Sequence, residues 1–287
     1  MLNRTLLALL AVCPLMIGCG KKVSQPAHRM DSTTSIEDSD YHWITFDDSS
    51  SGIHILLPEG YHEGEVDSSD IGLPWIALIQ TSDSTSLLRP VDVVFSRVVD
   101  ELLSTEDSLS AWDVKPKSKD SILFLLSGTD IKNGEYYGRS FVNVPLSFDS
   151  IRKNRFNVWI EHFVLLGIRY EVVTRFMDTM IISVDSDRFN KTVYVDSQQA
   201  IRHLTIDLMR VSSSGEEHQM LVNQENGDID GLPRLLWAGD VDGDGKLDVI
   251  LDVTNNYDLS LPALYLSSRA KGTGLVHEVA HRSSVGC

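Results

Sequence analysis

An acidic loop between two apolar segments near the C-terminus most constrains the fold of this chain. Asp240, Asp242, Asp244 and Asp248 occupy positions 1, 3, 5 and 9 of the loop, and Gly245 occupies position 6. Carboxylates at alternate positions converge when the chain turns tightly, and glycine permits that turn because it readily adopts positive φ. Ca²⁺ takes six to eight oxygen ligands, whereas carboxylates crowded together without a cation repel each other. The spacing therefore predicts a calcium-binding loop.

The segments on either side of the loop distinguish it from an EF-hand. An EF-hand has glutamate at position 12 and a helix on each side. Here position 12 is Leu251, and the flanking runs Leu235–Gly239 and Leu247–Leu251 have the composition of strands. We therefore expect a hairpin whose connection binds Ca²⁺. Lys246, at position 7, is expected to contribute its backbone carbonyl while its ammonium points to solvent.

This segment resembles the FG-GAP and VCBS repeats of integrin-like propellers, in which an acidic run of the same kind joins two strands of a blade. The resemblance extends over about residues 232–287, and Leu261–Ser267 matches a later strand of the unit. It implies that the ion is bound by the side chains of Asp240, Asp242, Asp244 and Asp248 and by the carbonyl of Lys246. It implies that Asp252 is an outer partner of the site, beyond these ligands. A propeller needs several blades, but the motif occurs once, with a degenerate echo at residues 226–231. We therefore expect one calcium-clipped hairpin and no full propeller.

The rest of the chain predicts a mainly β fold, with short antiparallel strands and a minor amount of helix. Short runs rich in β-branched and aromatic residues alternate with turn residues such as Pro58–Gly60 and Asn133-Gly134. A short helix is expected at Ser108–Trp112. Val91–Leu103 fits either a helix or a strand followed by a helical turn, and Phe156–Gly167 leaves the type of element open. The expected strands are His42–Phe46, Ile53–Leu57, Trp75–Gln80, Ser121–Leu126, Ser140–Val144, Tyr170–Arg175, Met180–Val184, Thr192–Val195 and Leu204–Leu208.

The N-terminus has the features of a lipoprotein signal peptide. Arg4 precedes the apolar run Leu6–Ile17, which is too short to span a membrane. Met16–Cys19 resembles the lipobox of bacterial lipoproteins, in which the signal peptidase cuts before the cysteine and the cysteine carries the lipid. The resemblance implies that residues 1–18 are removed and that Cys19 is acylated. Gly20, in place of aspartate, implies an outer-membrane anchor facing the periplasm in a Gram-negative host.

Composition then suggests the organisation and the partners of the mature chain. Residues 19–40 are polar and read as a flexible tether, followed by a β-rich domain over 41–210 and the calcium-loop region over 211–287, which can belong to the same domain. Lys plus Arg number 25 and Asp plus Glu 41, a net charge of −16. This balance argues against nucleic acid, whose phosphates require a basic face. The expected partners are the membrane, through the lipid, and an envelope protein or ligand that the sequence does not specify.

One further motif suggests an alternative function. His277-Glu278-Val-Ala-His281 matches H-E-x-x-H, which on a helix presents two imidazoles to Zn²⁺ and a glutamate as general base. No histidine follows His281, and the segment also reads as a strand, which would separate the two imidazoles by about 13 Å. The favoured interpretation is a non-catalytic, calcium-stabilised binding or structural module anchored in the cell envelope. A zinc metallohydrolase is the alternative.

Overall fold

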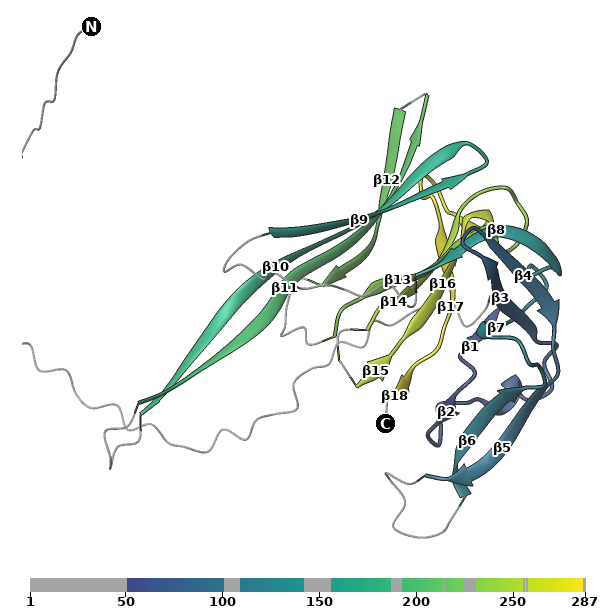
Figure 1. The fold of residues 1–287 in the computed structure, drawn as a ribbon, viewed down its shortest axis with the longest axis horizontal. Coiled ribbons are helices and arrows are strands. Elements are labelled where there is room, and N and C mark those ends of the chain that lie inside the picture. Colours follow the sequence, from purple (N-terminus) through teal and green to yellow (C-terminus); the bar gives the residue numbers. More distant parts are fainter. Residues whose placement is uncertain are drawn as a thin grey trace, which may run out of the picture. The chain divides into compact units, whose positions relative to one another are not determined.

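The computed structural model describes residues 51–100, 109–141, 156–186, 193–213, 215–224, 231–254, 256 and 258–285. Its strands pair in antiparallel fashion, which confirms the predicted mainly β fold (Figure 1). The helical content of this part consists of the 3₁₀ turns η1 (Ser68–Asp70) and η2 (Ser267–Arg269). Chain contacts separate Met1–Thr45 from Phe46–Cys287. The predicted signal peptide, Cys19, the tether and the expected strand His42–Phe46 lie outside the described residues.

The largest sheet has nine strands and curls until its two edge strands meet. Ser51, which precedes the edge strand β1, donates a hydrogen bond from its hydroxyl to the carbonyl of Val279 on the other edge strand, with an O···O distance of 2.5 Å. The sheet is therefore a nearly closed barrel. Its order is β1 (His54–Leu56), β7 (Ile122–Ser127), β3 (Ile76–Ser82), β4 (Thr85–Pro90), β8 (Gly134–Ser140), β13 (Arg234–Gly239), β14 (Asp248–Asp252), β16 (Pro262–Leu266) and β17 (His277–His281).

Three smaller sheets accompany the barrel. The four-stranded sheet has the order β12 (Gly215–Gln224), β11 (Val193–Ser212), β10 (Ile168–Ser186) and β9 (Phe156–Leu165). The three-stranded sheet has the order β2 (Gly60–Tyr61), β6 (Leu109–Pro116) and β5 (Val93–Val99). The third is a ribbon of β15 (Leu259–Ser260) and β18 (Ser284–Val285).

Several elements differ from the sequence-based expectation. The helix expected at Ser108–Trp112 is wrong, because the chain from Leu109 onward forms β6. There Trp112 pairs with Tyr61 on one side and Arg97 on the other, so cross-strand pairing overrides the local helical preference. The strands predicted separately at Tyr170–Arg175 and Met180–Val184 are one strand, β10. The strands predicted at Thr192–Val195 and Leu204–Leu208 likewise belong to one strand, β11. The open cases resolve as strands, β5 and β9.

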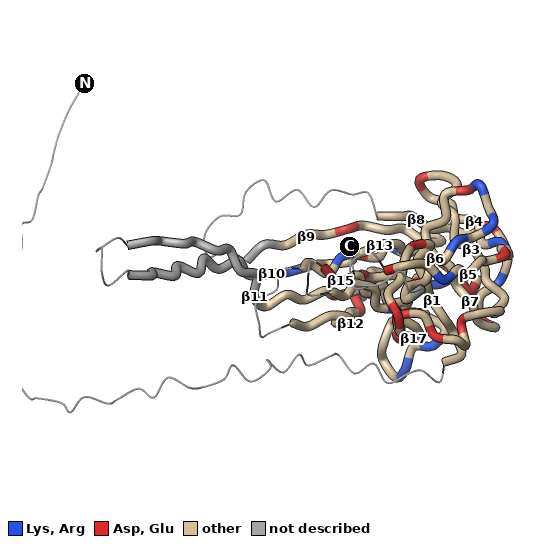
Figure 2. Tube along the Cα trace, turned by 90° about the horizontal axis from the view of Figure 1, so that it is seen from below, with Lys and Arg blue, Asp and Glu red and all other residues tan. Residues whose placement is uncertain are grey.

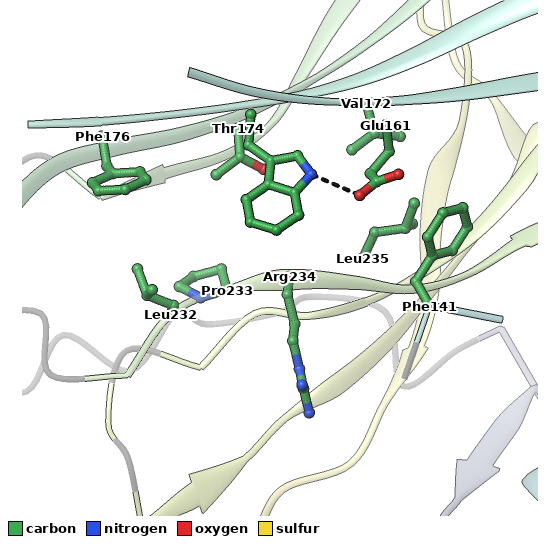
Figure 3. Close-up of a pocket in the computed structure, with 10 residues that line it drawn as sticks. Phe141, Glu161, Val172, Thr174, Phe176, Leu232, Pro233, Arg234 and Leu235 are labelled. Carbon is green, nitrogen blue, oxygen red and sulfur yellow. Dashed lines mark hydrogen bonds between the residues drawn. The ribbon is translucent and has the colours of Figure 1, made fainter. Parts of the chain in front are cut away.

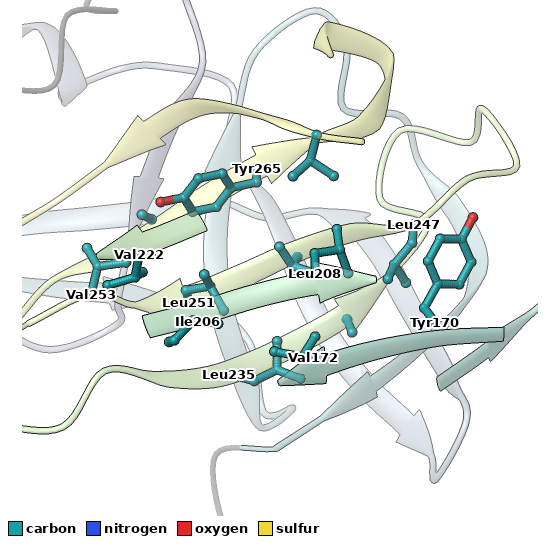
Figure 4. Close-up of a cluster of buried hydrophobic side chains, with 14 of the residues drawn as sticks. Tyr170, Val172, Ile206, Leu208, Val222, Leu235, Leu247, Leu251, Val253 and Tyr265 are labelled. Atoms are coloured by element: carbon teal, nitrogen blue, oxygen red, sulfur yellow. The ribbon is translucent and has the colours of Figure 1, made fainter. Parts of the chain in front are cut away.

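The C-terminal strands β13, β14 and β16 lie in the middle of the described core and are buried on both faces. On one face Val249, Leu251 and Ala263 pack against Ile206 and Leu208 of the four-stranded sheet (Figure 4). On the other face, Ile250, Leu264 and Leu266 pack into the barrel interior with Leu78 and Phe124. Strands covered on both faces read as continuous apolar runs and do not alternate with polar residues.

This packing bears on the domain organisation. Ile206 precedes residue 210, the expected boundary between the two regions, whereas Leu251 follows it, yet both belong to one buried cluster. The region that contains the acidic loop and the sheet before it therefore share a core. Within the described residues, no helix is long and apolar enough to cross a membrane.

A buried ion network joins the two ends of the described fold. Asp70 in η1 is fully buried, and its two carboxylate oxygens accept hydrogen bonds from Nη2 of Arg282 at 3.0 and 2.8 Å. Nδ1 of His54 on β1 lies 2.9 Å from the same carboxylate. Breaking such a pair would leave an uncompensated buried charge, so the segment after β17 is held firmly against the start of the sheet.

Candidate metal centre

The acidic run forms the connection of a hairpin, as the sequence predicts. Strands β13 and β14 pair in antiparallel fashion, with Gly239 opposite Asp248. Gly243 and Gly245 adopt φ angles of 78° and 83°, which glycine reaches at little cost. A Cβ on Gly243 would lie 3.1 Å from Cε1 of Tyr136, so the tyrosine ring would have to shift by a few tenths of an ångström to admit a larger residue. The loop is therefore shaped by its glycines as well as by its acids.

Three of the predicted ligands converge at this connection. One carboxylate oxygen from each of Asp240, Asp242 and Asp244 lies within 4.8 Å of the other two. Two unit charges within 4.8 Å repel by about 3 kcal/mol or more at an effective dielectric constant of about 20. Asp240 and Asp242 are 8% and 5% exposed, so water screens the repulsion between these two poorly, whereas Asp244 is exposed and better screened. A divalent cation between the three carboxylates would turn the repulsion into attraction.

The backbone of the loop holds these carboxylates in place. Asp240 accepts hydrogen bonds at Oδ1 from the N–H groups of Gly243 and Asp244, at 2.8 and 3.0 Å, and at Oδ2 from Gly245 at 2.9 Å. Oδ1 of Asp242 accepts from the N–H of Asp244 at 3.1 Å, and Oδ1 of Asp244 accepts from Lys246 at 2.8 Å. A carboxylate has about four lone-pair sites, so these bonds leave acceptor capacity for a cation.

Asp248, at position 9, has a different environment. It is fully buried and does not belong to the set of carboxylates within 4.8 Å of one another. Its Oδ2 accepts from the N–H of Val241 at 2.8 Å, and its Oδ1 accepts from the N–H of Ser267 at 2.7 Å. Asp248 therefore ties the start of the loop to the end of β16, and ligation of a cation would add to this role.

Two serines at the end of β16 complete the polar environment of the loop, and sequence reasoning did not identify them. The hydroxyl of Ser267 lies 2.9 Å from Oδ1 of Asp248 and 3.1 Å from Oδ1 of Asp244, within donating distance of either. The hydroxyl of Ser268 donates to Oδ2 of Asp242. The one signal for them was the match of Leu261–Ser267 to a later strand of the repeat.

Burial, together with neighbouring carboxylates, raises the pKa of two carboxyl groups in the loop. Burial raises the pKa of Asp240, the N–H groups of Gly245 and Gly243 oppose this shift, and the charges of Asp242 and Asp244 add to it. Burial raises the pKa of Asp248 well above its ordinary value, and the charge of Asp242 adds to the increase. In both cases the folded loop disfavours the ionised carboxylate, and a bound cation would reverse that preference.

The remaining candidates near the motif have more peripheral positions. The side chain of Lys246 is exposed, and its ammonium lies 3.7 Å from Oδ2 of Asp244. Asp252 lies at the end of β14 away from the loop, where Oδ1 accepts from the N–H groups of Thr254 and Leu261 at 3.2 and 3.1 Å. The structure thus places Asp252 in the turn that follows β14.

The H-E-x-x-H segment forms strand β17, which follows the strand interpretation. His277 lies opposite Leu266 and His281 opposite Ala263, at the two ends of the strand. Oε1 of Glu278 lies 3.0 Å from Nδ1 of His281, within hydrogen-bond distance. This geometry lacks the single helical face on which a zinc protease gathers its two imidazoles.

An apolar hollow lies between the four-stranded sheet and β13 (Figure 3). Val172 and Phe176 of β10 line it on one side, and Leu232 and Leu235 on the other. Its volume of about 40 Å³ leaves room for only a few water molecules. The hollow is therefore a packing irregularity of the core and too small for an organic ligand.

Comparison of the chain with family models, curated proteins and solved structures finds no match.

Proposed function

We propose that this protein is a lipid-anchored module of the cell envelope, stabilised by Ca²⁺, that acts by binding or by structural support without catalysis of its own. The observation that carries the calcium assignment is the convergence of the carboxylates of Asp240, Asp242 and Asp244 within 4.8 Å. The oxygen-only donor set and the tight glycine-containing loop suit a hard cation of flexible geometry. Asp248 and the carbonyl of Lys246 would complete the coordination.

The role of this cation would be structural, because the loop belongs to the core of the fold. Val241 and Leu247, on either side of the carboxylates, are 0% and 1% exposed. The loop joins β13 to β14, and its acids receive hydrogen bonds from Ser267 and Ser268 beyond β16. A cation held there would link three consecutive strands of the barrel.

The envelope location rests on the N-terminal sequence. Met16–Cys19 resembles a lipobox, and the polar residues 19–40 would give the folded part reach from the membrane. An acyl chain adds about 0.8 kcal/mol of membrane affinity per buried CH₂, so a multiply acylated Cys19 would anchor stably. Metabolic labelling with a fatty acid tests this step. We expect label in the wild type and none in Cys19→Ser, and equal labelling of both would contradict the anchor.

Thermal unfolding of the metal-stripped full chain, titrated separately with Ca²⁺, Mg²⁺ and Zn²⁺, tests the calcium assignment. We expect a saturable rise in Tm with Ca²⁺ that is lost in Asp244→Asn and kept in His281→Ala. A rise with Zn²⁺ alone, lost in His281→Ala, would instead support the zinc metallohydrolase. In that case Glu278→Gln should abolish proteolysis of a general substrate such as casein.

A further inference from the structure

A cleft separate from the acidic loop lies between the three-stranded sheet and the ribbon of β15 and β18. Its volume is about 570 Å³, within the range of small-molecule sites. Residues from the start of the fold, from β5 and β6, and from the C-terminal ribbon all contribute to its walls. Fourteen residues line the cleft.

The walls of this cleft combine apolar surface with carboxyl groups. Val98, Val99, Ala111, Trp112 and Val285 supply the apolar part. Val99 and Val285 are 39% and 47% exposed, so a ligand in the cleft would cover apolar surface that is now in water. This arrangement favours a ligand with an apolar body.

Two of the three carboxyl groups already have cationic or protonatable partners. Oδ2 of Asp113 lies 2.5 Å from Nζ of Lys115, and Oδ2 of Asp100 lies 2.5 Å from Nδ1 of the buried His62. Asp113 therefore has a cationic partner and Asp100 has an imidazole within hydrogen-bond distance, so both carboxyl groups already have partners within the chain.

Glu59 is the carboxyl group left without a cation. Its Oε1 accepts a hydrogen bond from the hydroxyl of Ser284 at 2.7 Å, and no cationic side chain is among the described groups that act on it. Burial raises its pKa, and the nearby charges of Glu65 and Asp252 add to the increase. A half-buried carboxyl group in a cleft, with acidic neighbours and no cation, is the arrangement that a cationic ligand would relieve.

We propose that this cleft binds a small organic cation, with a primary ammonium group at Glu59 and an apolar or aromatic body against Val99 and Trp112. The ammonium would donate to the carboxylate oxygens of Glu59, while the hydroxyl of Ser284 holds that carboxylate in place. The net charge of −16 favours approach of a cation, although acidic and basic residues are interspersed along the described strands (Figure 2). This inference is independent of the calcium loop.

Isothermal titration of the full chain with phenethylamine tests the proposal, with phenylethanol and phenylacetate as neutral and anionic probes of similar shape. We expect saturable binding of phenethylamine and at least ten-fold weaker binding of the other two. Equal binding of phenylethanol would indicate a hydroxyl or sugar site and overturn the cation assignment. Absence of saturable phenethylamine binding at millimolar concentrations would also overturn it.

Two variants test whether the ammonium group of the ligand binds at Glu59. Glu59→Gln keeps an acceptor for Ser284 but loses the charge, and we expect roughly ten- to hundred-fold weaker phenethylamine binding. Val99→Lys adds a cation on an exposed part of the wall and should weaken the amine more than phenylethanol. Glu63→Gln is the matched control, since this glutamate pairs with Arg97 and does not line the cleft. Unchanged amine binding in both folded cleft variants would refute the site, whatever the response to Ca²⁺.

Discussion

Asp242→Asn should invert the stability order of wild type and variant when Ca²⁺ is added. Without metal, Asp242 lies within 4.8 Å of the carboxylate oxygens of Asp240 and Asp244, and each such pair repels by about 3 kcal/mol or more at an effective dielectric constant of about 20. Asparagine keeps an oxygen for the N–H of Asp244 and removes this repulsion. We therefore expect metal-free Asp242→Asn to be at least as stable as the metal-free wild type.

With Ca²⁺ the order should reverse, because the removed charge is also a ligand. At a Ca²⁺ concentration of about 100 times the wild-type Kd, binding stabilises the wild type by about 2.7 kcal/mol. If the substitution weakens binding about a hundred-fold, the same concentration stabilises the variant by only about 0.4 kcal/mol. For a chain of this size, one kcal/mol corresponds to about 2–4 °C in Tm, so the wild type should gain about 5–11 °C and the variant about 1–2 °C.

Calorimetric or circular-dichroism melting in EGTA, and then in increasing Ca²⁺, measures both effects. Asp83→Asn is the matched control, because it removes the same charge from an exposed position in the turn between β3 and β4. Its Tm should rise with Ca²⁺ as that of the wild type does. An undiminished Ca²⁺ response in Asp242→Asn would refute the reasoning. So would a metal-free variant that is clearly less stable than the wild type.

Three further predictions concern the fold around these sites. Gly243→Ala should destabilise the fold by about 1–2 kcal/mol in urea unfolding, because its positive φ and the nearby tyrosine ring disfavour a Cβ; a neutral result would mean that the loop rearranges freely. Burial, Glu65 and Asp252 raise the folded-state pKa of Glu59, so wild-type stability should fall as pH rises from the ordinary value of 4.5 through the raised one. Glu59→Gln should flatten this part of the stability profile, and an unchanged profile would contradict the assignment. Trp237→Phe should cost about 2–4 kcal/mol, since the fully buried indole fills the barrel and donates to a serine on β4 at 3.0 Å; a loss below 1 kcal/mol in the same assay would contradict its packing role.

The hairpin around the acidic loop could be predicted because its signals are local. The positions of Asp240 and Gly245 fix the turn within a few residues, and the flanking runs are continuous apolar segments of strand length. Ser267 and Ser268 could not be predicted in the same way. They reach the loop only because β16 pairs with β14, and no sequence spacing encodes that contact.

Local sequence patterns also fail to predict the length of β10 and β11 and the composition of the cleft. A local pattern divides β10 in two, whereas its pairing with β11 continues across a bulge between Arg175 and Met177. In the cleft, Glu59 and Ser284 are far apart along the chain and meet through the closure of the barrel. Sequence reasoning finds groups that are neighbours in the chain, and it misses those that long-range pairing brings together.

Closure of the barrel also sets the order in which the fold can be completed. The strand next to Ser51 meets β17 near Val279, and the guanidinium that pairs with buried Asp70 comes from Arg282. During synthesis, the N-terminal residues of this contact are made long before the C-terminal residues that pair with them. The domain therefore has high contact order, and we expect it to fold slowly. The barrel can close only after nearly all of the polypeptide has left the ribosome. Until then the N-terminal strands have exposed apolar faces, because the C-terminal strands that cover them have not yet been made.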